Sequence, residues 1–363
     1  MDRGIPDRVP FMCQMSFGFM LLQTGFSPSE FWLSKDIFTK GLLHLRTLYD
    51  FDGILISLHG HSPDWEKSID RAERQKEQEI IFWKDGDKTI FPYDDLPTHV
   101  PGNKKSPKPI TEIDPETFPD RIEYIPVSLG LKFPIDPKHK FDIIDSIVEK
   151  AGSLYSVHGE VTSPFDYFLH YFGISEALMF LVSNPRKSKA ILQRYATGVT
   201  HLALEMTEHK VDAIKISSPF AGSGFISPHF YREFVLPYER QIVHSVRQQD
   251  VHIYTHTCGA IGDRLEMMAE SGISGLECLD PPPLGDVDLA EAKRRIGNKV
   301  FIKGNIDPIH VLLKGPPEII KKDTEEKIRI GNRGGGYILS TACSIAPHTP
   351  RSHVHILRET ADQ

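Results

Sequence analysis

The feature that most constrains the fold of this chain is a regular alternation of short apolar segments with longer amphipathic ones. Strand alternating with helix predicts a parallel sheet, and eight such units favour closure into a single α/β (β/α)8 TIM barrel, with an open doubly wound sheet as the alternative. Between the strands, Asn184–Glu208 and Pro228–Gln248 carry apolar residues at helical spacing. The eight predicted strands are Val9–Met15, Asp52–Leu58, Leu154–Glu160, Asp212–Ser217, His252–His256, Gly275–Leu279, Lys299–Gly304 and Gly336–Thr341.

One connection, after the second strand, is far longer than the others. We expect a single domain over residues 1–363, with residues 59–152 as an insertion in it. Within the insertion, Lys84–Asp87 has Asp85-Gly86 at its centre, which predicts a hairpin turn. Long insertions in barrel enzymes usually lie on the active-site face. The segment is therefore either a lid or partner-docking element, or a decoration that packs on the barrel wall.

Composition narrows the classes of protein to which this chain can belong. Four cysteines in 363 residues form no disulfide framework, which favours a reducing, cytoplasmic compartment. The chain has no apolar run of about 18 residues, so no membrane span is expected. Its formal net charge is −7, which is unlike the basic footprint of nucleic-acid-binding proteins.

Three residues with metal-ligating side chains are expected at the carboxyl ends of strands. His256 and Cys258 are two positions apart, so their side chains point the same way from one strand. Cys343 follows the last strand at the same face of the barrel, where barrel enzymes carry their active sites. One imidazole and two thiolates are typical of zinc, and three protein ligands leave an open position, as in catalytic sites. Another soft metal is the alternative.

A fourth candidate ligand lies on the strand Gly275–Leu279. Glu277 is placed to occupy the open position until substrate displaces it. Strand alternation then turns Cys278 the opposite way, as a small buried apolar residue. A shift of one residue in the register would exchange these two roles.

These motifs resemble the uroporphyrinogen decarboxylase superfamily, and within it the zinc-dependent methylcobamide (corrinoid):acceptor methyltransferases. The His-x-Cys … Cys pattern separates those methyltransferases from the decarboxylases. The resemblance implies zinc on His256, Cys258 and Cys343, with the supporting acid on Glu277. It covers most of the chain from about Val157 onward, and the residues that carry it are His158–Pro164, Asp212–Ser217, Ala221–Pro228, His256–Gly259, Leu279–Pro283, Lys303–Pro308 and Gly334–Cys343.

The resemblance implies transfer of a methyl group between a corrinoid and a small acceptor, with His256 and Glu277 in catalytic roles. The methylated corrinoid is free methylcobalamin or a corrinoid protein on a separate polypeptide, because this chain contains no Asp-x-His-x-x-Gly stretch. The acceptor is a thiol such as coenzyme M, or tetrahydrofolate. Five residues near strand ends are candidates to contact a cofactor, or else to cap loops: Ser217, Gly222, Ser223, Asn305 and His158.

Two other classes of function remain as alternatives. A uroporphyrinogen decarboxylase-like carboxy-lyase needs arginines for the carboxylates of its substrate, but the stretch Phe11–Gly18, where that family has them, contains none. A non-catalytic partner of a corrinoid protein would hold zinc only structurally, with four protein ligands and no open position.

Overall fold

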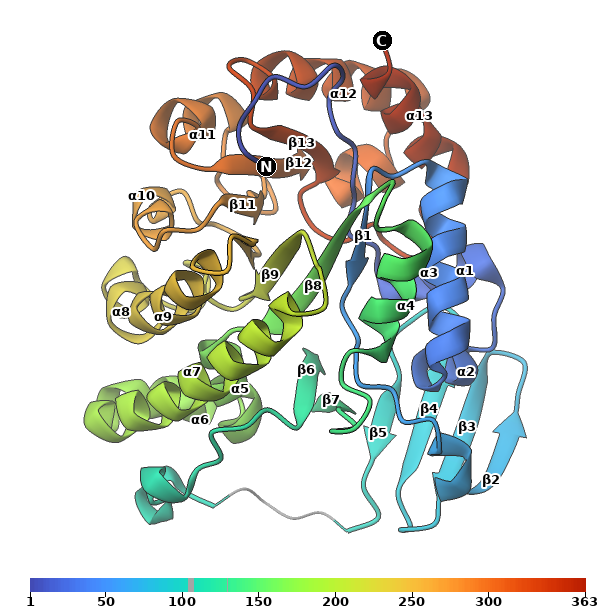
Figure 1. Ribbon diagram of the computed structural model, residues 1–363, viewed down its shortest axis with the longest axis vertical. Coiled ribbons are helices and arrows are strands. Elements are labelled where there is room, and N and C mark those ends of the chain that lie inside the picture. The colour runs from blue at the N-terminus through green and yellow to red at the C-terminus, as the bar shows by residue number, and fades with distance from the viewer. Residues whose placement is uncertain (104–107, 129) are drawn as a thin grey trace.

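The fold is built on a curled parallel sheet, seen in a computed structural model that describes residues 1–103, 108–128 and 130–363 (Figure 1). Residues 104–107 and 129 belong to the predicted insertion and lie outside the described residues. The strand order is β1-β8-β9-β10-β11-β12-β13, so neighbours in the sheet follow one another along the chain. The strands are β1 (Gly53–Ile56), β8 (Ser156–Thr162), β9 (Ala213–Ser217), β10 (His252–Thr257), β11 (Gly275–Cys278), β12 (Phe301–Ile306) and β13 (Tyr337–Thr341).

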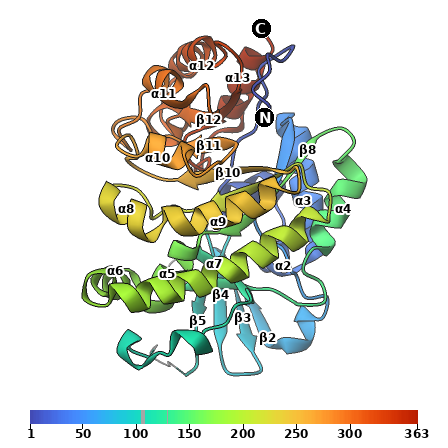
Figure 2. The same ribbon diagram turned by 60° about the vertical axis from the view of Figure 1, so that its left-hand side comes forward.

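Helices surround the outside of this sheet (Figures 1 and 2). The helix predicted over Asn184–Glu208 is confirmed as α7, Pro185–Thr207. The helix predicted over Pro228–Gln248 is divided into α8 (Pro228–Phe234) and α9 (Leu236–Arg247), because Pro237 favours the first turn of a new helix. The other α-helices are α1 (Phe17–Thr24), α2 (Pro28–Leu33), α3 (Lys35–Tyr49), α4 (Asp142–Ala151), α5 (Pro164–Phe172), α6 (Ile174–Ser183), α10 (Leu265–Ala269), α11 (Leu289–Ile296), α12 (Pro317–Gly331) and α13 (Arg351–Ala361). In the described part of the chain, none of the helices has both the length and the apolar character needed to span a membrane.

The N-terminal segment spans the two edges of the curled sheet. Phe11 forms a parallel bridge with Leu339 of β13, and its carbonyl accepts a hydrogen bond from the amide of Asp52, immediately before β1. Met15 forms a second bridge, with Ile345. The strand predicted at Val9–Met15 is therefore present as an extended segment with isolated bridges rather than as a regular strand.

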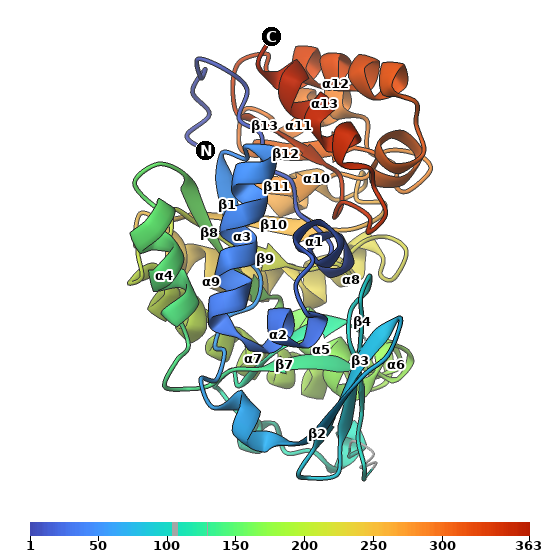
Figure 3. The same ribbon diagram turned by 90° about the vertical axis from the view of Figure 1, so that its right-hand side faces the viewer.

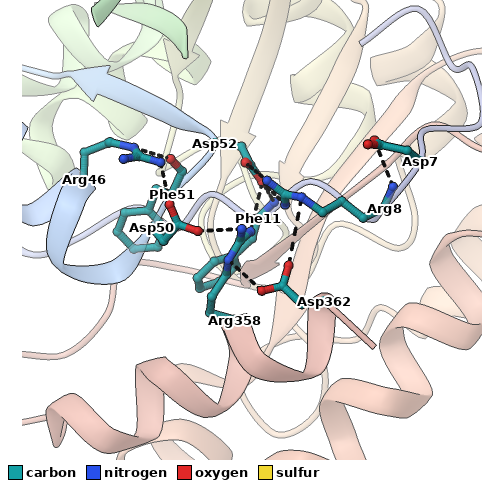
Figure 4. A network of polar contacts seen from close by, with 9 residues as sticks. All are labelled: Asp7, Arg8, Phe11, Arg46, Asp50, Phe51, Asp52, Arg358 and Asp362. Atoms are coloured by element: carbon teal, nitrogen blue, oxygen red, sulfur yellow. Dashed lines mark hydrogen bonds and ion pairs between the residues drawn. The ribbon is translucent and has the colours of Figure 1, made fainter. Parts of the chain in front are cut away.

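A network of ion pairs fixes this segment at the end of the sheet where the strands begin (Figure 4). The carboxylate of Asp52 accepts hydrogen bonds from the Arg8 guanidinium at 2.6 and 2.9 Å and from the amide of Phe11 at 2.8 Å. Arg358 of the C-terminal helix pairs with Asp50 at 2.6 Å. The network therefore joins the N-terminal segment, the loop between α3 and β1, and α13.

We expect Asp52→Ala to lower the free energy of unfolding by about 2 kcal/mol, since it removes charge-assisted hydrogen bonds in a partly buried setting. Urea denaturation measures this change. Asp36→Ala is the matched control, because Asp36 is 77% exposed and its loss should change stability by less than about 0.5 kcal/mol. Equal stability of the two variants would contradict the structural role of the network.

The inward side chains of the strands form layers, as the two-residue period of a strand requires. The layer nearest the strand starts is apolar and consists of Met12, Ala213, Tyr254, Phe301 and Ile338. Two residues further along the same segments, the layer is polar and consists of Gln14, Lys215, His256, Lys303 and Ser340. Cys258 and Cys343 follow beyond the strand ends. The apolar layer thus fills the end of the sheet where the strands start, and the metal-ligating candidates lie at the opposite end.

The segment between β1 and β8 contains a separate antiparallel sheet, β2 (Ile69–Arg74), β3 (Gln78–Trp83), β4 (Lys88–Pro92) and β5 (Thr98–Val100). The predicted hairpin is confirmed, because β3 and β4 pair on either side of Lys84–Asp87. A second hairpin pairs β6 (Tyr124–Ser128) with β7 (Leu131–Pro134). Figures 1 and 3 show the β2–β5 sheet at the opposite end of the molecule from α11–α13.

Candidate metal centre

An imidazole and two thiols meet at the carboxyl ends of β10 and β13. His256 lies on β10, and Cys258 and Cys343 follow β10 and β13 respectively. His256 Nε2 is 3.2 Å from Cys258 Sγ, which is 3.6 Å from Cys343 Sγ. All four cysteines are free thiols. The structure therefore brings together the three residues that the sequence predicts as metal ligands.

These separations fit a zinc ion. With usual bond lengths, two thiolates on tetrahedral zinc are about 3.8 Å apart, and a thiolate and an imidazole nitrogen are about 3.6 Å apart. The observed distances are shorter by only a few tenths of an ångström. The thiols of Cys258 and Cys278 beside Cys343 hold the pKa of Cys343 well below its ordinary value. A thiolate is thus available at the site, and a thiolate is the form that binds zinc.

Cys278 joins the group, contrary to the expectation that it turns away. Its sulfur and the ligand atoms of His256 and Cys258 all lie within 4.8 Å of one another. Strand alternation fails at this point because Cys278 has a φ of 87° and the following Leu279 a φ of 56°, both in the left-handed region. The end of β11 therefore presents two consecutive side chains, Glu277 and Cys278, to the same interior.

Glu277 occupies a different place from the ligand position predicted for it. Its Oε2 is 2.9 Å from Nδ1 of His256, while Cys258 lies at Nε2 of the same ring. The other carboxylate oxygen accepts from Lys303. Glu277 faces inward, as alternation predicts, but it supports the imidazole from behind and lies outside the group of converging ligand atoms.

A buried charged layer surrounds Glu277. Lys215 Nζ lies 2.9 Å from Glu160 Oε2 and 3.7 Å from Glu277 Oε2, and it donates to Gln14 Oε1 at 2.9 Å. Lys215 and Lys303 are both completely buried. Burial alone would raise the pKa of Glu277, but Lys303 and Lys215 hold that pKa well below its ordinary value. Glu277 therefore carries a negative charge, which favours a proton on Nδ1 of His256 and leaves Nε2 for a metal.

A cavity of about 380 Å³ opens onto His256, Cys258 and Cys343. The segment between β1 and β8 supplies part of its wall, through Asp95, Leu96 and residues 125–128. Residues of the predicted insertion therefore lie next to the candidate metal centre. The cavity wall also includes Trp32, Phe17, Phe220, Glu160 and Asp166.

Of the five residues predicted to contact a cofactor, Ser217 lines this cavity. His158 lies deeper, hydrogen-bonded to Ser156 and to the hydroxyl of Tyr254 at 3.0 Å. Asn305 donates to the carbonyl of Leu279 at 2.9 Å and so fixes a loop.

Gly222 and Ser223 are not part of the described cavity wall either. A Cβ atom at Gly222 would lie 2.6 Å from the carbonyl oxygen of Cys258, so this glycine allows two loops to approach closely. The amide of Ser223 donates to Ala260 at 2.8 Å. Both residues position the loop after β9 against the end of β10.

Sequence reasoning missed the two lysines of the charged layer. Each lies in a short apolar strand, in Ala213–Ser217 and in Phe301–Ile306, where a charged side chain is rarely buried without a partner. A lysine within an apolar strand could have indicated this layer, because a buried lysine requires an acidic partner, here on a neighbouring strand.

Comparisons with known proteins agree with this fold. The uroporphyrinogen decarboxylase (URO-D) family matches residues 126–363. A solved methyltransferase from Methanosarcina mazei superposes with a TM-score of 0.73, covering 98% of this chain and 94% of that one at 19% identity. At that identity the likeness concerns the fold alone.

Similar curated sequences include members of two enzyme classes. A methylcobamide:CoM methyltransferase of Methanosarcina acetivorans is 27% identical over 220 residues, which cover 61% of this chain and 62% of the relative. A uroporphyrinogen decarboxylase of Crocosphaera subtropica is 28% identical over 244 residues, which cover 63% and 65%. The match thus spans less than two thirds of the length of either relative.

Proposed function

This chain belongs to the uroporphyrinogen decarboxylase family, and on that premise we propose that it is a zinc-dependent methyltransferase acting between a corrinoid and a small acceptor. One observation carries the proposal: His256, Cys258 and Cys343 converge at the floor of an open cavity. Relatives of this chain include proteins named methylcobamide:CoM methyltransferase, and this likeness supports the proposed reaction.

In this proposal His256, Cys258 and Cys343 hold zinc. Zinc bound there lowers the pKa of a substrate thiol, so that a thiolate nucleophile persists at neutral pH. Glu277 accepts the Nδ1 proton of His256 and thereby orients the ring. Glu277 is a positioning residue, since its carboxylate contacts the imidazole and the lysines rather than the cavity.

The acceptor enters the cavity above these residues, and the methylated corrinoid approaches from the cavity mouth. The corrinoid is free methylcobalamin or belongs to a corrinoid protein in trans. The acceptor is a small thiol such as coenzyme M, or tetrahydrofolate. We further interpret the seven strands and residues 9–15 together as one (β/α)8 barrel in a single domain, with residues 59–152 inserted in it, working in the cytoplasm.

The cavity disfavours the carboxy-lyase alternative. Its described wall contains neither arginine nor lysine, the cationic partners that a substrate with many carboxylates requires. The two buried lysines closest to the centre are directed at Glu277 and Glu160. A purely structural metal site is disfavoured because three of the converging side chains line a cavity that a substrate can enter.

The direct test is a methyl-transfer assay with zinc-loaded protein and free methylcobalamin. Each acceptor is supplied in turn, including coenzyme M, 2-mercaptoethanol and tetrahydrofolate. We expect loss of the cobalt–carbon absorbance that depends on one acceptor, with the methylated product identified by mass spectrometry. Absence of transfer to every acceptor, from free and from protein-bound corrinoid, would reject the proposal.

We expect Glu277→Gln to weaken zinc binding by about 10- to 100-fold, the usual cost of losing a group that orients a ligand. The substitution keeps the shape of the side chain but removes the charge that orients His256. Competition with a chromophoric chelator measures the affinity. Glu239→Gln is the control, because Glu239 is equally buried but hydrogen-bonds Tyr231 instead, and its zinc affinity should stay unchanged. Unchanged zinc affinity in Glu277→Gln would remove the positioning role.

A further inference from the structure

We propose that Cys278 is a further ligand of the metal centre, and that it fills the position which the acceptor takes over. This inference rests on the zinc site of the proposed function. Cys278 lies outside the His-x-Cys … Cys pattern. With Cys278 as a ligand, the metal without substrate is bound by three thiolates instead of two.

The first support is convergence. The sulfur of Cys278 and the ligand atoms of His256 and Cys258 all lie within 4.8 Å of one another. These side chains and that of Cys343 come from the ends of β10, β11 and β13, so three parts of the sheet contribute to one centre. Cys278 is completely buried. A buried thiol within 4.8 Å of a second thiol and an imidazole nitrogen is in the setting of a zinc ligand.

The second support is the backbone conformation that turns the Cys278 side chain toward His256 and Cys258. Regular continuation of β11 would place Cys278 on the opposite face from Glu277. The φ of 87° at Cys278 reverses this, in a left-handed region that residues with a side chain rarely adopt. Leu279 is left-handed as well. The chain therefore adopts an unfavourable local conformation that delivers this thiol to the cluster.

The third support is direction. His256, Cys258 and Cys343 line the cavity, whereas Cys278 is not part of its described wall. Cys278 therefore leaves the cavity open to the acceptor.

The fourth support is a second partner for the thiol. Cys278 Sγ donates to Asp280 Oδ2 at 3.2 Å, and the amide of Gly259 donates to the same oxygen at 2.7 Å. Cys278 therefore has a hydrogen-bond acceptor ready when it leaves the ligand position.

This second partner distinguishes the site from a permanently closed one. Four protein ligands without an alternative partner are typical of structural zinc. Cys278 has an alternative partner, and an open cavity lies over the other three ligands. We therefore expect Cys278 to stabilise the resting site and to compete with the acceptor.

X-ray absorption at the zinc edge tests the ligand assignment on the full-length zinc protein. We expect three sulfurs and one nitrogen around zinc in the unsubstituted chain, and two sulfurs in Cys278→Ala. Cys13→Ala is the matched control: Cys13 is also a buried free thiol, and its removal should leave three sulfurs. Two sulfurs in the unsubstituted protein would overturn the inference while leaving the proposed function intact. Absence of bound zinc would overturn the proposed function itself.

Calorimetric titration with 2-mercaptoethanol tests the exchange. Without the competing thiol, Cys278→Ala should bind 2-mercaptoethanol at least about tenfold more tightly, while its zinc affinity falls by more than about tenfold. Cys278→Ser keeps the shape of the side chain, and it replaces Cys278→Ala in this experiment if the alanine variant fails to fold. Equal affinity for the thiol in the unsubstituted protein and both variants would overturn the exchange.

Discussion

Cys343→Ser and His256→Ala are expected to lose bound zinc and methyl transfer together. Each substitution removes one of the converging ligand atoms, and the zinc affinity should fall by more than about 100-fold, beyond the usual effect of outer partners. Because the proposed role of zinc is to activate the acceptor, the rate of transfer should fall in parallel. Zinc per chain after dialysis and the rate with free methylcobalamin measure the two effects on the same samples.

Cys13→Ser provides the control for this experiment. It removes a buried free thiol that lies outside the ligand group, and it should keep both zinc and activity. Adding excess zinc to the two ligand variants should restore little activity. Retained zinc with normal turnover in either Cys343→Ser or His256→Ala would contradict the proposed site.

The second large effect is expected from Lys303→Met, which should lower the free energy of unfolding by about 3–5 kcal/mol. Lys303 and Glu277 are both completely buried and paired, and the substitution leaves a buried carboxylate without its nearest cation. The side chain of methionine fills nearly the same space as that of lysine. The change in the free energy of unfolding therefore reflects the lost charge more than altered packing. Denaturant unfolding measures it.

A double variant separates charge from packing. Lys303→Met combined with Glu277→Gln removes both charges of the pair, and it should be more stable than Lys303→Met alone because no carboxylate is left beside the apolar side chain. Lys321→Met is the surface control, since Lys321 is 51% exposed and its loss should change stability by less than about 0.5 kcal/mol. A single variant as stable as the unsubstituted protein would show that the charged layer is not structural.

Much of the fold follows from local patterns that the sequence displays directly. Seven predicted strands are present, because apolar runs bounded by turn residues depend on few long-range contacts. The helix over Pro185–Thr207 follows from its spacing of apolar residues. The hairpin at Lys84–Asp87 follows from its Asp-Gly turn. The convergence of His256, Cys258 and Cys343 follows from their common position at strand ends.

Other features depend on information that the strand pattern lacks. The place of Cys278 is set by a left-handed backbone at the end of β11, which alternation does not encode. The role of Glu277 is set by Lys303 and Lys215, which come from neighbouring strands far away in sequence. The N-terminal segment bridges β13 at Phe11 and the loop after β13 at Met15, and Pro10 has no amide proton to donate to a regular ladder.

The most direct test of the account is the metal content of anaerobically purified protein with its thiols confirmed as reduced. We predict about one zinc per chain, the amount expected for one catalytic site. No bound metal, together with failure to take up added zinc, would contradict the account.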